Sequence, residues 1–115
     1  MMLERTDVLV REVLDRMFGI GECDFGRMND HIYLTVPLHK MRSATGNYGL
    51  RADERVSLGV DDVDIMVDDY GLTINFGRVG RHLKIPSSVE LDKDRIDAVC
   101  RNGILDIVAW YKRVE

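Results

Sequence analysis

The sequence has little of what disulfide-stabilised, membrane-spanning or nucleic-acid-binding proteins require. It contains two cysteines in 115 residues, and Cys23 and Cys100 lie too far apart in the chain to form a CxxC motif. No apolar run approaches the roughly 20 residues of a membrane span, and charged residues between positions 4 and 16 interrupt any signal peptide. A net charge of −4 without a basic block disfavours nucleic acid as a partner. We therefore expect reduced thiols, a cytoplasmic location, and no contact with membranes or nucleic acids.

Motifs for catalysis and metal binding are also missing from the sequence. There is no GxSxG nucleophile elbow and no Gly-Lys-Ser/Thr phosphate loop, and the histidines form neither HxxxH nor HExxH. The acidic run VDDVDIMVDD does not fit an EF-hand, which needs glycine at its sixth position and glutamate at its twelfth. Counting from Asp61, those positions are Met66 and Leu72. We predict no enzyme activity, no metal site and no cofactor.

What the chain contains is enough apolar material for one domain, with 45% hydrophobic and 31% charged residues. Residues 6–18 predict a helix that Thr6 or Asp7 caps and Gly19 ends. Its apolar stripe, spaced as on one helix face, consists of Val10, Val13, Leu14, Met17 and Phe18. Either this helix packs on its own domain, or it is an amphipathic arm whose stripe binds a partner or an unfolded client. We assign residues 1–22 to the helical arm and 23–115 to the domain.

From residue 31 onward the apolar period changes from 3.6 to 2, which is typical of half-buried strands. Strands are predicted at 31–38, 63–67, 72–76 and 79–85. A loop at 68–71 would form three apolar cross-strand pairs, namely Val67–Leu72, Ile65–Ile74 and Val63–Phe76. Residues 39–59 have no periodicity and predict a long surface loop, and residues 87–94 predict a polar connection.

The register is best defined at the last hairpin, AVCRNGILDI. Asn-Gly is the preferred pair for a two-residue type I′ turn, because both positions need φ > 0. A turn at positions 102 and 103 opposes small or apolar residues, in the pairs Cys100–Leu105, Ala98–Ile107 and Ile96–Ala109. A slip by one residue would turn Asp97 and Asp106 into the core. Short strands with turns between them indicate an all-β antiparallel sandwich carrying one N-terminal helix.

Several positions on the outward side of these strands are more apolar than solvent-facing positions usually are. They are Met66, Val99, Ile104, Val108 and Trp110. Two explanations stay open, since either another part of the chain or a protein partner could cover them. Under the second explanation they form a client- or partner-binding surface.

Three stretches in the second half of the chain carry a family resemblance. Residues 98–105 read A-x-x-x-N-G-I-L, the segment before them reads GRHLKIPSSVELDKDRID, and an earlier hairpin reads DVDIMVDDYGLTI. Together they resemble the α-crystallin domain of small heat-shock proteins over residues 60–111. The resemblance implies an immunoglobulin-like β-sandwich and an ATP-independent chaperone, a holdase that binds partly unfolded clients through exposed apolar surface and suppresses their aggregation. It also implies that Arg81, in the strand before Pro86, supports a dimer interface.

The sequence departs from this family in two places. Only four residues separate Phe76 from Arg81, where many members carry a swapped dimerisation strand. The sequence ends at Glu115 without the C-terminal Ile/Val-x-Ile/Val tail that links dimers. We therefore expect a monomer or homodimer rather than a large cage. The alternative function is a protein-interaction module of the CS-domain type, acting as a co-chaperone or assembly adaptor.

Overall fold

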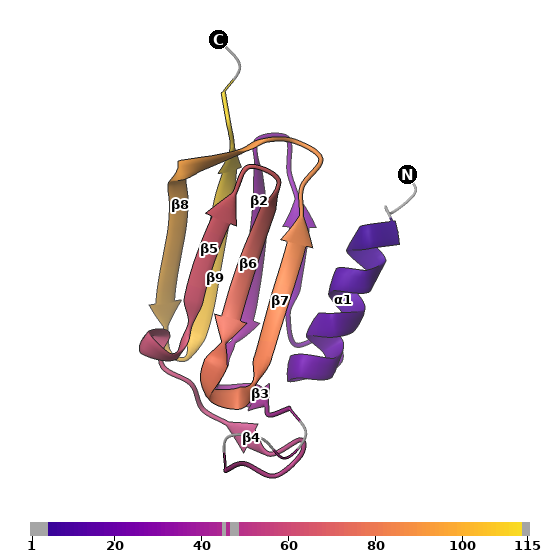
Figure 1. Ribbon diagram of the computed structural model, residues 1–115, viewed down its shortest axis with the longest axis vertical. Helices are drawn as coiled ribbons and strands as arrows, with labels where there is room; N and C mark the ends of the chain where they lie inside the picture. The colour runs from indigo at the N-terminus through magenta and orange to yellow at the C-terminus, as the bar shows by residue number, and fades with distance from the viewer. Residues whose placement is uncertain (1–4, 45, 47–48, 114–115) are drawn as a thin grey trace.

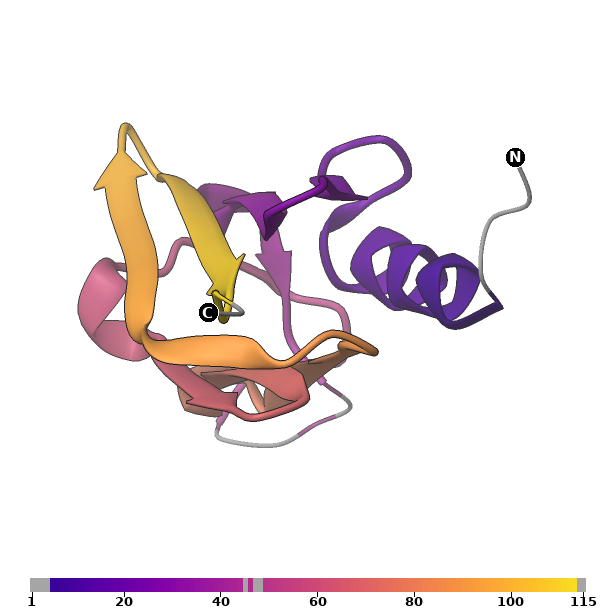
Figure 2. The same ribbon diagram turned by 90° about the horizontal axis from the view of Figure 1, so that it is seen from above.

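A computed structural model describes residues 5–44, 46 and 49–113, and its two larger antiparallel sheets pack face to face (Figures 1 and 2). The four-stranded sheet runs in the order β1 (Asp24–Arg27), β2 (His31–Pro37), β9 (Ile104–Tyr111), β8 (Leu91–Arg101). The three-stranded sheet runs in the order β5 (Asp64–Asp68), β6 (Gly71–Phe76), β7 (Arg81–Pro86). The predicted antiparallel sandwich is confirmed. The described part of the chain has no helix long and apolar enough to cross a bilayer.

The β5–β6 hairpin follows the predicted register over most of its length. Val67 lies opposite Leu72 and Ile65 opposite Ile74, and pairing at the closed end leaves only two residues in the turn. At the open end the ladder stops at Asp64, because a 3-10 turn precedes it. The third predicted pair, Val63 with Phe76, therefore does not form within the ladder.

The β8–β9 hairpin has the predicted register. All three predicted pairs are present, namely Cys100–Leu105, Ala98–Ile107 and Ile96–Ala109. The turn residues Asn102 and Gly103 both have positive φ, at 53° and 77°, as a type I′ turn requires. Strand β8 begins at Leu91 rather than near residue 95, because a register shift between Leu91 and Ile96 lets it continue past an irregularity. The predicted polar connection is shorter by the same amount.

The described residues of the segment 39–59 contain short elements of secondary structure that the predicted loop lacked. A 3-10 turn at Leu38–Lys40 leads into a small ribbon of β3 (Met41–Arg42) paired with β4 (Arg55–Val56). Met41 and Leu58 are buried in the core, so both ends of the segment are anchored. The prediction overlooked this because two-residue strands are too short to show a period.

Helix α1 (Arg5–Phe18) closes the open side of the sandwich between β1 and β7 (Figure 2). Four residues of its stripe are at most 4% exposed, and they are Val10, Leu14, Met17 and Phe18. Val13 is partly buried against the same core, and the Phe18 ring meets Phe76 edge-on at 5.9 Å. Of the two alternatives that the sequence left open, the structure has the first, a helix packed on its own domain, and the assignment of these five residues to a client-binding surface is corrected because the sandwich buries the stripe.

Two arginines form hydrogen bonds that connect α1 with the edges of β1 and β7. Arg11 donates to the carbonyl of Phe25 at 2.6 Å, while Arg27 pairs with Asp7 at 2.8 Å and donates to the carbonyl of Pro86 at 2.7 Å. Thr6 and Asp7 both lie inside the helix, so neither caps it as predicted, and Asp7 anchors the helix to Arg27 instead. The unpaired edge carbonyls of β1 and β7 thereby obtain partners.

Candidate functional site

The outward apolar residues are divided between two faces of the sandwich. Val99, Ile104, Val108 and Trp110 lie on the outer face of the four-stranded sheet, because their neighbours Cys100, Leu105, Ile107 and Ala109 face the interior. Met66 lies opposite Thr73 on the outer face of the three-stranded sheet. The two outer faces point in opposite directions (Figure 2). The predicted five residues are therefore not one surface, and Met66 stands apart.

On the four-stranded sheet, β2 adds two aromatic residues to this face. His31 lies opposite Trp110 and Tyr33 opposite Val108. The ring centroids of His31 and Trp110 are 4.9 Å apart, and those of His31 and Tyr33 are 6.3 Å apart. We call this surface the outer patch, which comprises His31, Tyr33, Val99, Ile104, Val108 and Trp110. Helix α1 packs beside β7 and β3 and leaves this face uncovered.

A glycine in β1 gives the Tyr33 ring its place in the outer patch. Gly26 lies opposite Tyr33, and a Cβ atom built on Gly26 would stand 2.5 Å from the Tyr33 hydroxyl oxygen. The aromatic ring therefore lies directly against the bare backbone of β1. This cross-strand contact extends the apolar surface from β8 and β9 to the far edge of the sheet.

Charged groups of both signs surround the outer patch. The Arg95 guanidinium lies 5.0 Å above the Trp110 ring, a cation–π contact, and Asp30 bonds His31 at 2.6 Å. Thr35 donates to Asp106 at 2.6 Å between the apolar residues. The patch is therefore mixed, with apolar rings and aliphatic side chains interrupted by the Thr35–Asp106 pair and flanked by charged groups.

Arg81 has an intramolecular role. Its guanidinium donates to the carbonyls of Arg42 at 3.2 Å and Ser43 at 2.9 Å, and Asp53 lies 3.8 Å away. These bonds hold the 39–59 segment against the start of β7. Two of its donors, Nε and Nη2, are thus engaged within its own chain, and a part for Arg81 in a dimer interface stays a prediction.

The two cysteines are free, and the surroundings of Cys23 keep its thiol protonated at neutral pH. Burial raises the pKa of its thiol to about 12, and the nearby carboxylates of Asp15 and Glu22 add to this effect. In a Cys100→Ser variant we expect iodoacetamide to modify native Cys23 at pH 8 at least ~100-fold more slowly than the urea-unfolded chain, because the thiolate is the reactive form. Mass spectrometry gives both rates. Equal rates would show that Cys23 is accessible and ordinary.

Comparisons with known proteins support the fold. No protein-family model matches the sequence, and no curated protein matches it. Among solved structures, the chain is similar to heat shock protein 16.0 from Schizosaccharomyces pombe, with a TM-score of 0.52 and 20% sequence identity. The match covers 80% of this chain and 66% of that protein. At this identity the likeness concerns the fold, and it agrees with the predicted α-crystallin type of β-sandwich.

Proposed function

We propose that this protein is an ATP-independent holdase that binds partly unfolded proteins through the outer patch. The observation that carries the proposal is the exposure of this apolar surface on a sheet face that the described residues leave uncovered. Val99 is 46% exposed and Ile104 is 39% exposed. An unfolded client exposes apolar segments of its own, and burying the two surfaces together favours association without nucleotide. The two free cysteines suit a reducing compartment such as the cytoplasm.

The small heat-shock resemblance of the sequence and the α-crystallin type of fold agree with this proposal. Neither feature distinguishes a holdase from an adaptor. A second function, a protein-interaction module acting as co-chaperone or assembly adaptor, is favoured by the charged groups of the patch. Arg95, Asp97 and Asp106 lie between or beside its apolar residues, and interspersed charges of fixed position select one partner more than many clients.

The proposed holdase activity is tested by heating an aggregation-prone enzyme with stoichiometric amounts of this protein, without ATP, and following light scattering. We expect the protein to suppress scattering. The Trp110→Ser variant and the double variant Val99→Ser, Ile104→Ser should lose most of this effect, because each removes apolar surface that the client would bury.

Met66→Ser is the matched control. Met66 is 61% exposed, but it lies on the opposite outer face, so its removal should leave suppression unchanged. Far-UV circular dichroism verifies that all variants fold. If the unmodified protein fails to reduce scattering at several-fold excess, the holdase proposal is wrong and the adaptor remains. Equal losses for Met66→Ser and Trp110→Ser would show that client binding is not confined to the outer patch.

A further inference from the structure

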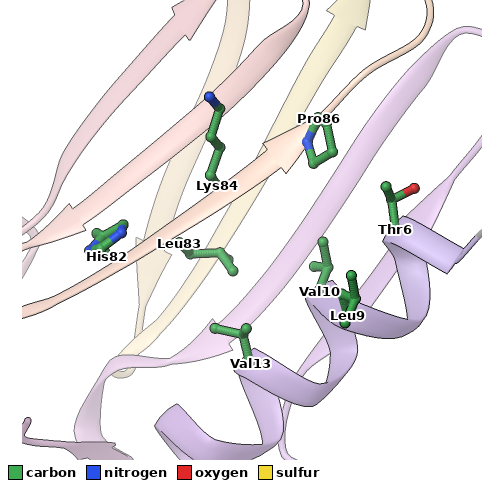
Figure 3. A pocket seen from close by; sticks show the side chains of 8 residues that line it. All are labelled: Thr6, Leu9, Val10, Val13, His82, Leu83, Lys84 and Pro86. Carbon is green, nitrogen blue, oxygen red and sulfur yellow. The ribbon is translucent and has the colours of Figure 1, made fainter.

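An apolar groove lies between α1 and the outer edge of β7 (Figure 3). It holds a cavity of about 300 Å³, at the lower end of the volumes typical of ligand sites. The helix contributes Leu9, Val10 and Val13, and the strand contributes Leu83 and Pro86. Leu9 is 52% exposed, so the groove keeps apolar surface open to solvent although Val10 and Leu83 beneath it are buried.

Strand β7 presents free backbone groups to this groove. It is the last strand of its sheet. The N–H of Ser87 donates back to the β5–β6 turn, whereas the carbonyl of Pro86 points the other way and accepts from Arg27. Because these directions alternate along a strand, the N–H and C=O groups of His82 and Lys84 also point away from β6. In the described residues no strand pairs with them on that side.

The rim of the groove is basic, although the whole chain has a net charge of −4. His82 and Lys84 are exposed on the strand side. The groove continues past them into a second cavity of about 220 Å³, which Arg16 lines. Arg81 lines it as well, but its guanidinium already bonds the 39–59 segment and lies 3.8 Å from Asp53. Within the described part of the chain, no carboxylate lines either cavity. The rim therefore favours an acidic occupant.

We propose that this groove binds an extended segment of another protein, in which apolar residues alternate with aspartate or glutamate, as an added strand on the edge of β7. An added strand would exchange main-chain hydrogen bonds with His82 and Lys84. Its side chains would point alternately to the two faces of the sheet. Those on the inner face would enter the cavity beside Leu9 and Leu83, and those on the outer face would meet Lys84 and His82.

This site differs from the outer patch in position and in chemistry. The groove belongs to the three-stranded sheet and α1, whereas the outer patch belongs to the four-stranded sheet. An unpaired strand edge favours a ligand with an extended backbone, and the basic rim favours acidic side chains on that ligand. The groove is therefore proposed to recognise a linear sequence motif, a more selective task than holding unfolded clients.

The probe is a fluorescein-labelled peptide of alternating valine and glutamate. We expect a saturable rise in fluorescence anisotropy, and slower amide hydrogen exchange at His82 and Lys84 when the peptide is bound. Peptides with lysine in place of glutamate, or with a central proline, should bind at least about tenfold more weakly, because they reverse the charge or remove a ladder donor.

Two exposed positions test the groove in the protein. Leu9→Glu and Lys84→Glu should each raise the dissociation constant at least about tenfold, because each places a negative charge against an acidic peptide. Val8→Glu is the control, since Val8 is 40% exposed on the same helix but does not line the cavity.

Absence of saturable binding would overturn the proposal, as would equal binding of the lysine peptide. Binding that leaves exchange at His82 and Lys84 unchanged would also overturn it. If the protein alone sediments as a dimer with slow exchange at both residues, the edge of β7 belongs to a second copy of the chain and the proposal is wrong.

Discussion

Phe18→Ala is expected to lower the free energy of unfolding by about 3–5 kcal/mol, the usual cost of truncating a fully buried phenylalanine. The Phe18 side chain has 0% exposure and packs edge-on against Phe76 of the three-stranded sheet. In the part of the chain that the structure describes, α1 alone fills the side of the sandwich between β1 and β7, so the vacated volume has few neighbours able to collapse into it. Urea unfolding followed by circular dichroism measures the loss.

Ile20→Ala is the matched control, two residues further along the chain. Ile20 is 89% exposed, so its truncation should change stability by less than about 0.5 kcal/mol. A cost below about 1 kcal/mol for Phe18→Ala would show that the helix contributes little to the fold. In that case α1 would be a loosely held arm, and its apolar stripe would again be a candidate client-binding surface.

The parts of the fold that the sequence predicts are those governed by local rules. The period of two marks β2, β6 and β9 because one face of each is buried, and Asn102-Gly103 defines a turn that few other residue pairs can form. Strand β1 was not predicted, because its sequence DFGR has a single apolar residue, Phe25, on the buried face. Its glycine is explained only by Tyr33 on the neighbouring strand, which is information that no local pattern contains.

The outer patch was predicted only in part, because a local sequence pattern does not show which strands lie side by side. Strand parity identifies Val99 and Trp110 as outward, but it does not say which of two opposite faces an outward residue occupies, so Met66 was grouped with them. His31 and Tyr33 were overlooked because their polar atoms fit an ordinary solvated face. The dimer role of Arg81 came from the family resemblance alone. Its bonds to the carbonyls of residues 42 and 43 could not be predicted, because these residues are distant in sequence.

Gly103→Val is expected to destabilise the protein by about 2–3 kcal/mol, combining a β-branched residue at positive φ with a steric clash. Gly103 has φ = 77°, and a Cβ atom there would lie 2.9 Å from Nδ1 of His39. The strain falls on the turn that sets the register of β8 against β9. No alternative register has a similar free energy, since a slip by one residue would bury Asp97 and Asp106. Thermal and urea unfolding measure the effect.

Asn102→Gly is the control for Gly103→Val, because it changes the neighbouring turn residue without straining the backbone. Glycine adopts the φ of 53° at position 102 without strain, so the change should cost no more than about 1 kcal/mol, mainly through the greater freedom of the unfolded chain. Nuclear Overhauser contacts between Cys100 and Leu105 should persist in both variants, because the buried side chains and not the turn alone determine the pairing. If Gly103→Val unfolds at the same urea concentration as the unmodified protein, the turn does not require positive φ at this position. The register would then rest on the apolar pairs by themselves.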